Sequence, residues 1–179
     1  MPGERVYLYD TTLRDGAQTH GVDFSAADKA AIADALDSIG IDYIEGGWPG
    51  ANPRDDAFFQ QEHNLTTSTL TAFGMTRRSG RSAANDPSLT AVLSANTPAV
   101  CLVGKTHDAH ALTALGVDLE ENLRMILESV SECVNRGRET IFDAEHFFDG
   151  YKANSNYADR KSTRLNSSHS QQSRMPSSA

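Results

Sequence analysis

Short apolar stretches alternate with helix-like stretches along most of the chain. Five apolar stretches have the length of a β-strand and contain β-branched or aromatic residues, which favour strands. They are residues 5–10, 41–45, 68–74, 99–104 and 139–145. Each of the first four is followed by a helix-like stretch, at residues 25–40, 52–59, 85–95 and 118–137. This pattern predicts strands and helices in strict alternation.

Each helix-like stretch opens with a residue type that caps helix N-termini. Ser25 is followed three residues later by Asp28, a spacing that resembles a capping box. Asn52 and Asp86 are each followed by a proline, which suits the first turn of a helix. Asp118 opens the longest stretch. We therefore expect four helices that begin at these residues.

The spacing of apolar residues predicts which face of each helix is buried. In the first helix Ile32, Leu36 and Ile39 recur on one face, and Gly40 ends the helix. In the longest helix Gly137 has the same role. Its expected inward residues are Leu123, Ile126, Leu127 and Val130. Both helices are therefore expected to pack one face on a sheet.

Alternating strands and helices with short connections indicate an α/β protein with a parallel sheet. The sheet is either open and doubly wound or closed into a (β/α)8 barrel. The chain has neither a G-x-G-x-x-G string after the first strand nor a P-loop, so the common nucleotide-binding sheets are not favoured. A complete barrel needs about 250 residues, so we expect a truncated (β/α)8 TIM barrel with about its first five β/α units.

Charged and polar residues gather after the predicted strands, at their carboxyl ends. In both closures ligands bind at that edge of the sheet, so this side is the predicted functional side. The residues are Asp10, Arg14, Asp15, Glu45, Arg77, Arg78, Lys105, His107, Asp108, Asp143, Glu145 and His146.

Composition and charge limit the classes of partner. The net charge is −8 without a basic stripe, which argues against nucleic acid. No apolar run is long enough to span a membrane, and the start of the chain lacks a signal-type segment. Cys101 and Cys133 lie in apolar surroundings and match no zinc-binding spacing, so we expect two buried free thiols. These features predict a soluble, cytoplasmic protein.

The composition changes abruptly at Asp159. From there to Ala179 serine dominates and the apolar periodicity stops. One interpretation is a disordered polar terminus. The other is a translated sequencing adapter, because a common adapter encodes DRKSTRLNSSH in one frame and its far end encodes SRMPSSA. We favour the adapter, and expect a partial catalytic barrel at residues 1–158 and a disordered, non-native tail at residues 159–179.

The string TLRDGAQ has two interpretations when it is taken alone. Asp15 is a suitable ligand for a hard metal ion, and Arg14 can stabilise negative charge on a substrate oxygen. Alternatively, the two residues form a surface ion pair beside a turn glycine. Their place at the carboxyl end of a barrel strand favours the first interpretation.

Longer strings carry a family resemblance. YDTTLRDGAQ resembles the opening of the metal-dependent acyl-CoA aldol barrels, which include isopropylmalate, homocitrate and citramalate synthases and hydroxymethylglutaryl-CoA lyase. DYIEGGWPGANPRD, FGMTRR and DAEHFFDGYKAN are similar to the citramalate synthase branch. Isopropylmalate synthases more usually show RDGEQ and AGFP where this chain has RDGAQ and GGWPG. The resemblance runs from Val6 to Ala158.

The resemblance implies roles for five residues. Arg14 would polarise the keto oxygen of a 2-oxo acid, and Glu45 would hold Arg14 by ion pairing or serve as an inward structural carboxylate. Asp15 would bind a divalent metal, Mg²⁺ or Mn²⁺, and Gln18 would line the substrate site. Glu145 would be the base that takes a proton from acetyl-CoA, or would only orient Arg14 or His146.

Further ligands complete the implied site. Arg77 and Lys105 would bind the substrate carboxylate or the phosphates of coenzyme A, unless they are ordinary solvated cations. His146 is either a hydrogen-bond donor behind the site or a core histidine. The family supplies two more metal ligands from an H-x-H pair, which this chain lacks; His107 and His110 are three residues apart.

The implied reaction of the parent protein joins acetyl-CoA and pyruvate into citramalate with release of coenzyme A, and the parent is expected to be a homodimer. The alternatives within the family are condensation with 2-oxoisovalerate and a lyase reaction in the reverse direction. The alternative of another class is a partial barrel without catalytic activity.

Overall fold

The computed structural model describes residues 5–159 and shows five parallel strands in the order β1-β2-β3-β4-β5. Each strand pairs in parallel with the next along the chain. The strands are β1 (Tyr9–Asp10), β2 (Tyr43–Gly47), β3 (Thr69–Met75), β4 (Ala99–Lys105) and β5 (Glu139–Glu145). Parallel neighbours in sequence order, each reached through a helical connection, form part of a (β/α)8 barrel, as the sequence predicts.

Helices fill the connections. They are α1 (Ala26–Ser38), α2 (Pro53–Phe59), α3 (Pro87–Ser94), α4 (Asp108–Ala114), α5 (Leu119–Asn135) and α6 (Phe147–Ala153), with 3-10 turns η1 (Gly16–Gln18) and η2 (Ala83–Asn85). Side-chain caps confirm the predicted starts of α1, α2, α3 and α5, because Ser25, Asn52, Asp86 and Asp118 each accept a backbone N–H of the first turn. Ser25 and Asp28 form the expected capping box.

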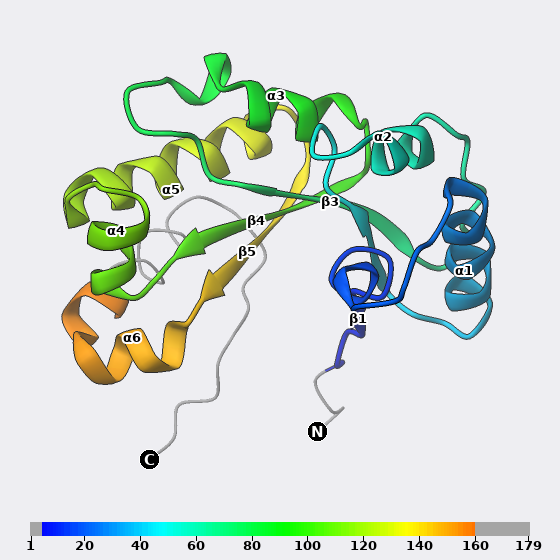
Figure 1. The fold of residues 1–179 in the computed structure, drawn as a ribbon, viewed down its shortest axis with the longest axis horizontal. Helices are drawn as coiled ribbons and strands as arrows, with labels where there is room; N and C mark the ends of the chain where they lie inside the picture. Colours follow the sequence, from blue (N-terminus) through cyan, green and yellow to red (C-terminus); the bar gives the residue numbers. More distant parts are fainter. Residues whose placement is uncertain (1–4, 160–179) are drawn as a thin grey trace.

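The helices cover one face of the curled sheet. Figure 1 shows α1, α2, α3 and α5 along the outer side of the strands, and the opposite side between β1 and β5 carries none of these helices. Two apolar clusters lie under the helices. One joins Leu102 of β4 to Val92 of α3 and Ile126 of α5, and the other joins Ile44 of β2 to Phe58 of α2. The core thus lies between the sheet and its outer helices.

The inner face carries the polar residues. Side chains alternate between the two faces of a strand, and the register places Phe73 of β3 opposite Cys101 of β4. Tyr43 and Glu45 lie on the inner face of β2, and Tyr43 donates its hydroxyl to Glu139 of β5 at 2.7 Å. The register shifts between Glu45 and Gly47, where β2 carries an irregularity.

Some sequence expectations need correction. The first strand was expected from Arg5 to Asp10, but β1 is only two residues long. Among the described residues it pairs with one neighbouring strand, β2. Ile39 was expected on the buried face of α1 but lies after the helix and is 73% exposed, and Lys29, Ala33 and Asp37 are buried instead. The short helices α4 and α6 were not predicted; each is seven residues long, too short for clear periodicity.

The expectations for the two cysteines and for the buried face of α5 are confirmed. Cys101 and Cys133 are buried free thiols, and burial, their largest influence, raises the pKa of each to about 12. In α5 the apolar residues Leu123, Ile126 and Val130 are buried. Among the described helices, none combines the length and apolar character needed to cross a membrane. Residues 160–179 of the predicted adapter tail lie outside the described residues, and Asp159 is helical.

Candidate functional site

The loop after β1 places Arg14 and Asp15 at the carboxyl edge of the sheet. The backbone N–H groups of Arg14, Asp15 and Gly16 all donate to the carbonyl oxygen of Thr11, at 3.1, 2.9 and 3.1 Å. This tight turn leads into η1 and fixes the loop over the end of its own strand. The neighbouring residue Leu13 is fully buried and anchors the loop in the apolar cluster of α1 and α2.

Arg14 and Glu45 form the central ion pair of the site. Arg14 Nε donates to Glu45 Oε1 at 2.8 Å, and Nη2 lies 3.5 Å from Oε2. The Glu45 side chain is 1% exposed and that of Arg14 is 15% exposed. Burial acts to lower the pKa of Arg14, but the hydrogen bond and charge of Glu45 outweigh it and the pKa is raised. Arg14 therefore stays a fixed cation.

Burial also dominates the ionisation of Glu45. Its pKa is raised, mainly because the carboxylate is desolvated, although Arg14 and Tyr9 act to lower it and Asp143 acts to raise it. A buried carboxylate beside a single guanidinium keeps that guanidinium in one orientation. This supports the expected contact between Glu45 and Arg14.

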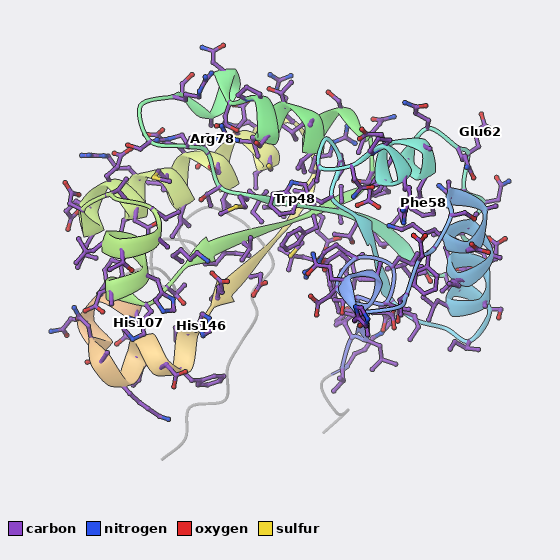
Figure 2. The ribbon with its side chains drawn as sticks, viewed as in Figure 1. Trp48, Phe58, Glu62, Arg78, His107 and His146 are labelled. Atoms are coloured by element: carbon purple, nitrogen blue, oxygen red, sulfur yellow. The ribbon has the colours of Figure 1, made fainter. Side chains whose placement is uncertain are left out.

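An aromatic ring supports the Arg14 guanidinium from another side. Its carbon Cζ lies 3.9 Å from the ring centroid of Phe73 on β3. The ring of Trp48 meets Phe73 edge-on, with centroids 5.4 Å apart and an interplanar angle of 80°. Figure 2 places Trp48 near the middle of the molecule, beside β3. The aromatic ring excludes water from the face of the guanidinium on which it stacks. The N–H groups lie in the plane of the guanidinium, so they stay able to donate along its edges.

A buried ion pair holds the loop that carries Trp48. Lys29 of α1 pairs with Asp55 of α2, and its Nζ also donates to the carbonyl of Gly46 at 3.0 Å. Asp55 accepts the backbone N–H of Trp48 at 2.8 Å. Both charged side chains are almost completely buried. The outer helices thus fix Trp48, and Trp48 contacts the ring under Arg14.

Asp15 points outward from the same loop. Its side chain is 62% exposed, and Oδ1 accepts Arg14 Nη1 at 3.0 Å. This exposed carboxylate has the hard oxygen ligands that Mg²⁺ and Mn²⁺ prefer. Within residues 5–159, no three His, Cys, Asp or Glu side chains are arranged to hold a metal ion. Asp15 is therefore not part of a three-residue metal-ligand group among the described residues.

Strand β5 brings two more carboxylates to the inner face. Glu145 pairs with Lys105, which lies opposite it in the register of β4 and β5. The pKa of Asp143 is raised, first because surrounding protein reduces its solvation; Arg14 acts against this, and the charges of Glu145 and Asp15 add to it. Lys105 and Glu145 thus lie at the predicted edge, and their contact is with each other.

Arg77 lies in a different environment. Its guanidinium donates to Glu128 at 2.6 Å and to Glu121 at 2.9 Å, both on α5, and its side chain is 5% exposed. The pKa of Arg77 is raised because these two carboxylates outweigh the effect of burial. The structure therefore directs this charge toward the outer helix α5, and the substrate-binding role stays a prediction.

Gln18 ends the turn η1. Its backbone N–H donates to the carbonyl of Asp15 at 3.0 Å, and the residue is exposed. The structure keeps Gln18 near Arg14 along the chain, and its expected contact with a substrate stays a prediction.

Three histidines meet at the ends of β4 and β5. The rings of His107 and His110 stack with centroids 4.9 Å apart, and His110 meets His146 edge-on at 4.8 Å. Figure 2 shows His107 and His146 beside each other at this edge. His146 is exposed and has a left-handed backbone with φ of 57°. The alternative that His146 is a core histidine is therefore wrong.

Sequence reasoning missed Phe73, Trp48 and Tyr9 as parts of the site. Phe73 and Tyr9 look like ordinary strand residues, and their contacts join separate strands. The available signal was the alternation of side chains along each strand. Every second residue of a strand points to the same face, so it can be assigned to the inner face that carries Glu45. The irregularity after Glu45 breaks that count on β2.

Comparisons with known proteins identify the family of the chain. Residues 5–158 match the HMGL-like family. The chain belongs to the HMGL-like family. It is 54% identical over 157 residues to an (R)-citramalate synthase of Aquifex aeolicus, covering 87% of this chain and 30% of that protein. It is 50% identical to the (R)-citramalate synthase of Streptomyces coelicolor, covering 85% and 29%.

A more distant sequence relative and a solved structure extend the comparison. A 2-isopropylmalate synthase of Chromobacterium violaceum is 32% identical over 148 residues, covering 80% of this chain and 27% of that protein. The hydroxymethylglutaryl-CoA lyase structure from Pseudomonas aeruginosa superposes with a TM-score of 0.61 at 18% identity, covering 77% of this chain and 45% of that one. The chain thus spans about 30% of the length of the citramalate synthases that it matches.

Proposed function

We propose that the protein is a citramalate synthase-type acyltransferase, which condenses acetyl-CoA with pyruvate and water to give citramalate and free coenzyme A. The observation that carries the proposal is the fixed Arg14–Glu45 pair on the inner face, in a chain 54% identical to an (R)-citramalate synthase. The 32% identity to a 2-isopropylmalate synthase is lower, which favours pyruvate over 2-oxoisovalerate.

Arg14 has the central role in this proposal. Glu45 and Phe73 take up one edge and one face of its guanidinium. The group is thereby preorganised to donate to the keto oxygen of the oxo acid and to stabilise the negative charge that forms there when the carbon is attacked. Because its partners hold it before the substrate arrives, little reorganisation accompanies the reaction.

Glu145 is the proposed base for the acetyl methyl proton. A C–H acid of this kind is weak and needs a positioned acceptor. Glu145 lies on the inner face at the end of β5, where it pairs with Lys105. Lys105 is also a proposed ligand for a substrate carboxylate or a coenzyme A phosphate, and Gln18 and Arg77 are proposed to complete substrate binding.

A divalent metal, Mg²⁺ or Mn²⁺, belongs to the proposal through Asp15. Bound there, it would polarise the keto group of the oxo acid. Asp15 would be its ligand from the described residues. The other ligands would come from a part of the full-length protein that corresponds to the additional length of the relatives. The homodimeric state, a cytoplasmic location and a role in isoleucine and other branched-chain amino-acid biosynthesis are proposed with the reaction.

The decisive experiment is an oxo-acid comparison with a full-length protein that contains residues 1–158. We expect coenzyme A release from acetyl-CoA to be fastest with pyruvate and to be lost on chelation of divalent metal. Preference for 2-oxoisovalerate would instead indicate an isopropylmalate synthase, and cleavage of an acyl-CoA without condensation would indicate a lyase.

The 179-residue chain itself is proposed to be inactive, because it spans about 30% of the length of these relatives and its described residues form no group of three or more metal-ligand side chains. The same assay with this chain should give no metal-dependent release of coenzyme A. Clear turnover would contradict this second proposal and leave the first intact.

A further inference from the structure

Trp48 lies directly after β2, and the proposed reaction gives it no role. It is the single tryptophan of the chain. Its side chain is partly buried, and its ring meets that of Phe73 edge-on, with centroids 5.4 Å apart. The Phe73 ring in turn lies under the guanidinium of Arg14, with 3.9 Å between Cζ and the ring centroid. The indole is therefore one residue removed from the group that is proposed to meet the oxo acid.

The backbone of Trp48 is held from the outer side of the sheet. Its N–H donates to Asp55 of α2 at 2.8 Å, and Asp55 pairs with Lys29 of α1. Lys29 Nζ also donates to the carbonyl of Gly46 at 3.0 Å. A side chain at Gly47 would not fit here, because a Cβ atom on it would lie 2.6 Å from Cγ of Asp55. The buried ion pair thus holds the backbone on both sides of Gly47.

The guanidinium of Arg14 needs more than one contact to keep a single orientation. Glu45 holds it along one edge, through Nε at 2.8 Å, and this contact alone leaves the group able to tilt about that edge. The face of Phe73 prevents the tilt only while the ring keeps its own orientation. Phe73 is 5% exposed, and the edge-on contact with Trp48 is an arrangement that aromatic pairs favour. The indole therefore limits the rotation of the ring on which Arg14 rests.

We propose that Trp48 is a positioning residue for Arg14: its indole keeps the Phe73 ring flat against the guanidinium. The proposal rests on the proposed function only in taking Arg14 as the group that meets the oxo acid. The contacts run from the Lys29–Asp55 pair to the backbone of Trp48, and from its ring through Phe73 to Arg14. Small errors in the placement of a reacting group are costly, so a tilted guanidinium would lower the rate without losing its charge.

The first test follows the Nε proton of Arg14 by NMR in the full 179-residue chain, labelled with nitrogen-15 at arginine. Arg14→Lys assigns the signal. In Trp48→Leu, which removes the aromatic edge, we expect the ring-current shift of this proton to be largely lost. Trp48→Phe keeps an aromatic edge and should retain most of the shift. An unchanged Arg14 proton in Trp48→Leu would overturn the proposal.

Phe147→Leu is the matched control. Phe147 is also partly buried and meets Phe148 edge-on, with centroids 5.6 Å apart and an interplanar angle of 79°, but both residues belong to α6. This variant should leave the Arg14 proton unchanged. The Nε proton of Arg77, which donates to Glu128 at 2.6 Å, shows in the same spectrum whether a variant keeps its fold.

A reciprocal measurement decides the question even if Trp48→Leu does not fold. Because the chain has one tryptophan, labelling with fluorotryptophan gives one fluorine signal, that of Trp48. In Arg14→Lys we expect this signal to move, because the Phe73 ring loses its partner on the other side, and Phe147→Leu should leave it in place. An unchanged fluorine signal in Arg14→Lys would overturn the proposal. Neither readout depends on turnover, so failure here is distinct from failure of the proposed reaction.

Kinetics in the full-length protein separate positioning from substrate contact. If Trp48 acts through Arg14, Trp48→Leu should lower kcat severalfold with little change in the KM for the oxo acid, and Trp48→Phe should recover most of the rate. In an Arg14→Lys background the same change should have no further effect. An equal loss in both backgrounds, or a raised KM with an unchanged kcat, would contradict the positioning role.

Discussion

Arg14 Nε donates to Glu45 Oε1 at 2.8 Å, across 31 residues of sequence, and Glu45 is almost fully buried on the inner face of the sheet. The contact fixes the guanidinium before any substrate binds. Another donor of Arg14, Nη1, points to Asp15 on the loop after β1.

Arg14→Lys should remove the forked geometry while keeping the positive charge. A lysine cannot hold Glu45 and offer directed donors to a keto oxygen at the same time. In the full-length protein we expect kcat/KM for the oxo acid to fall by about 100-fold or more, as for loss of an oxyanion donor. Arg78→Lys is the control, because Arg78 is exposed and its backbone N–H donates to Asp86, which is not part of this pair. A loss within about twofold for Arg14→Lys would contradict the role of the fork.

Phe73→Leu should release the face of the guanidinium. The contact of 3.9 Å between Arg14 Cζ and the ring centroid is lost, and such contacts contribute about 0.5–2 kcal/mol. We therefore expect kcat to fall about twofold to thirtyfold, and the ring-current shift of the Arg14 Nε proton to disappear. Phe58→Leu is the matched control, since Phe58 of α2 is also buried but packs in the cluster with Ala33 of α1 and Ile44 of β2. If both variants lose the same activity, general destabilisation explains the effect.

Lys29→Met should destabilise the chain strongly. It leaves the buried Asp55 carboxylate without its cation, a change that typically costs about 3–5 kcal/mol. Urea unfolding of Lys29→Met, Asp55→Asn and the double variant measures the coupling between the two residues. We expect the double variant to be less destabilised than the sum of the single variants. Strict additivity would mean that the pair contributes no interaction of its own.

Asp37 should make the stability dependent on pH in the acid range. Its carboxylate accepts the backbone N–H groups of Thr66, Thr67 and Ser68 at 2.7–2.9 Å. These bonds hold its pKa well below the ordinary value of 3.8. Because the folded-state pKa is the lower one, this stabilisation is present above about pH 4 and is lost as the pH falls through the folded-state value.

Unfolding free energies from pH 7 to pH 3 test this in Asp37→Asn. We expect the variant to be less stable at neutral pH and the difference from the native chain to narrow toward pH 3. Asp34→Asn is the control on the exposed face of the same helix. Parallel curves for Asp37→Asn and the native chain would place the acid sensitivity elsewhere.

The parts of this fold that were predictable from sequence are those that local chemistry decides. Capping by Ser25 and Asp118 is confirmed because a cap involves residues three apart. The place of Arg14 and Glu45 at one edge follows from parallel strands. The exposure of Ile39 was not predictable from periodicity, because the helix ends one residue earlier.

The parts that were not predictable depend on contacts between distant segments. Nothing local to FGMTRR shows that Arg77 meets Glu121 and Glu128, which are more than 40 residues away. The ring under Arg14 is equally invisible, since Phe73 reads as a core residue of β3. The roles of Gln18, Lys105 and Glu145 stay predictions, since the structure gives their positions and not their ligands.

The hydrogen bond from Tyr43 to Glu139 has a consequence for the order of folding. It joins β2 and β5, which are separated by 96 residues and by two intervening strands. Such a bond forms late, because closing so long a loop is entropically costly until β3 and β4 have bridged the gap. The pKa of Tyr43 is raised to about 12, mainly by burial and then by Glu139. Loss of this phenol proton at strongly alkaline pH would remove the donor that ties β2 to β5, because a phenolate oxygen can only accept.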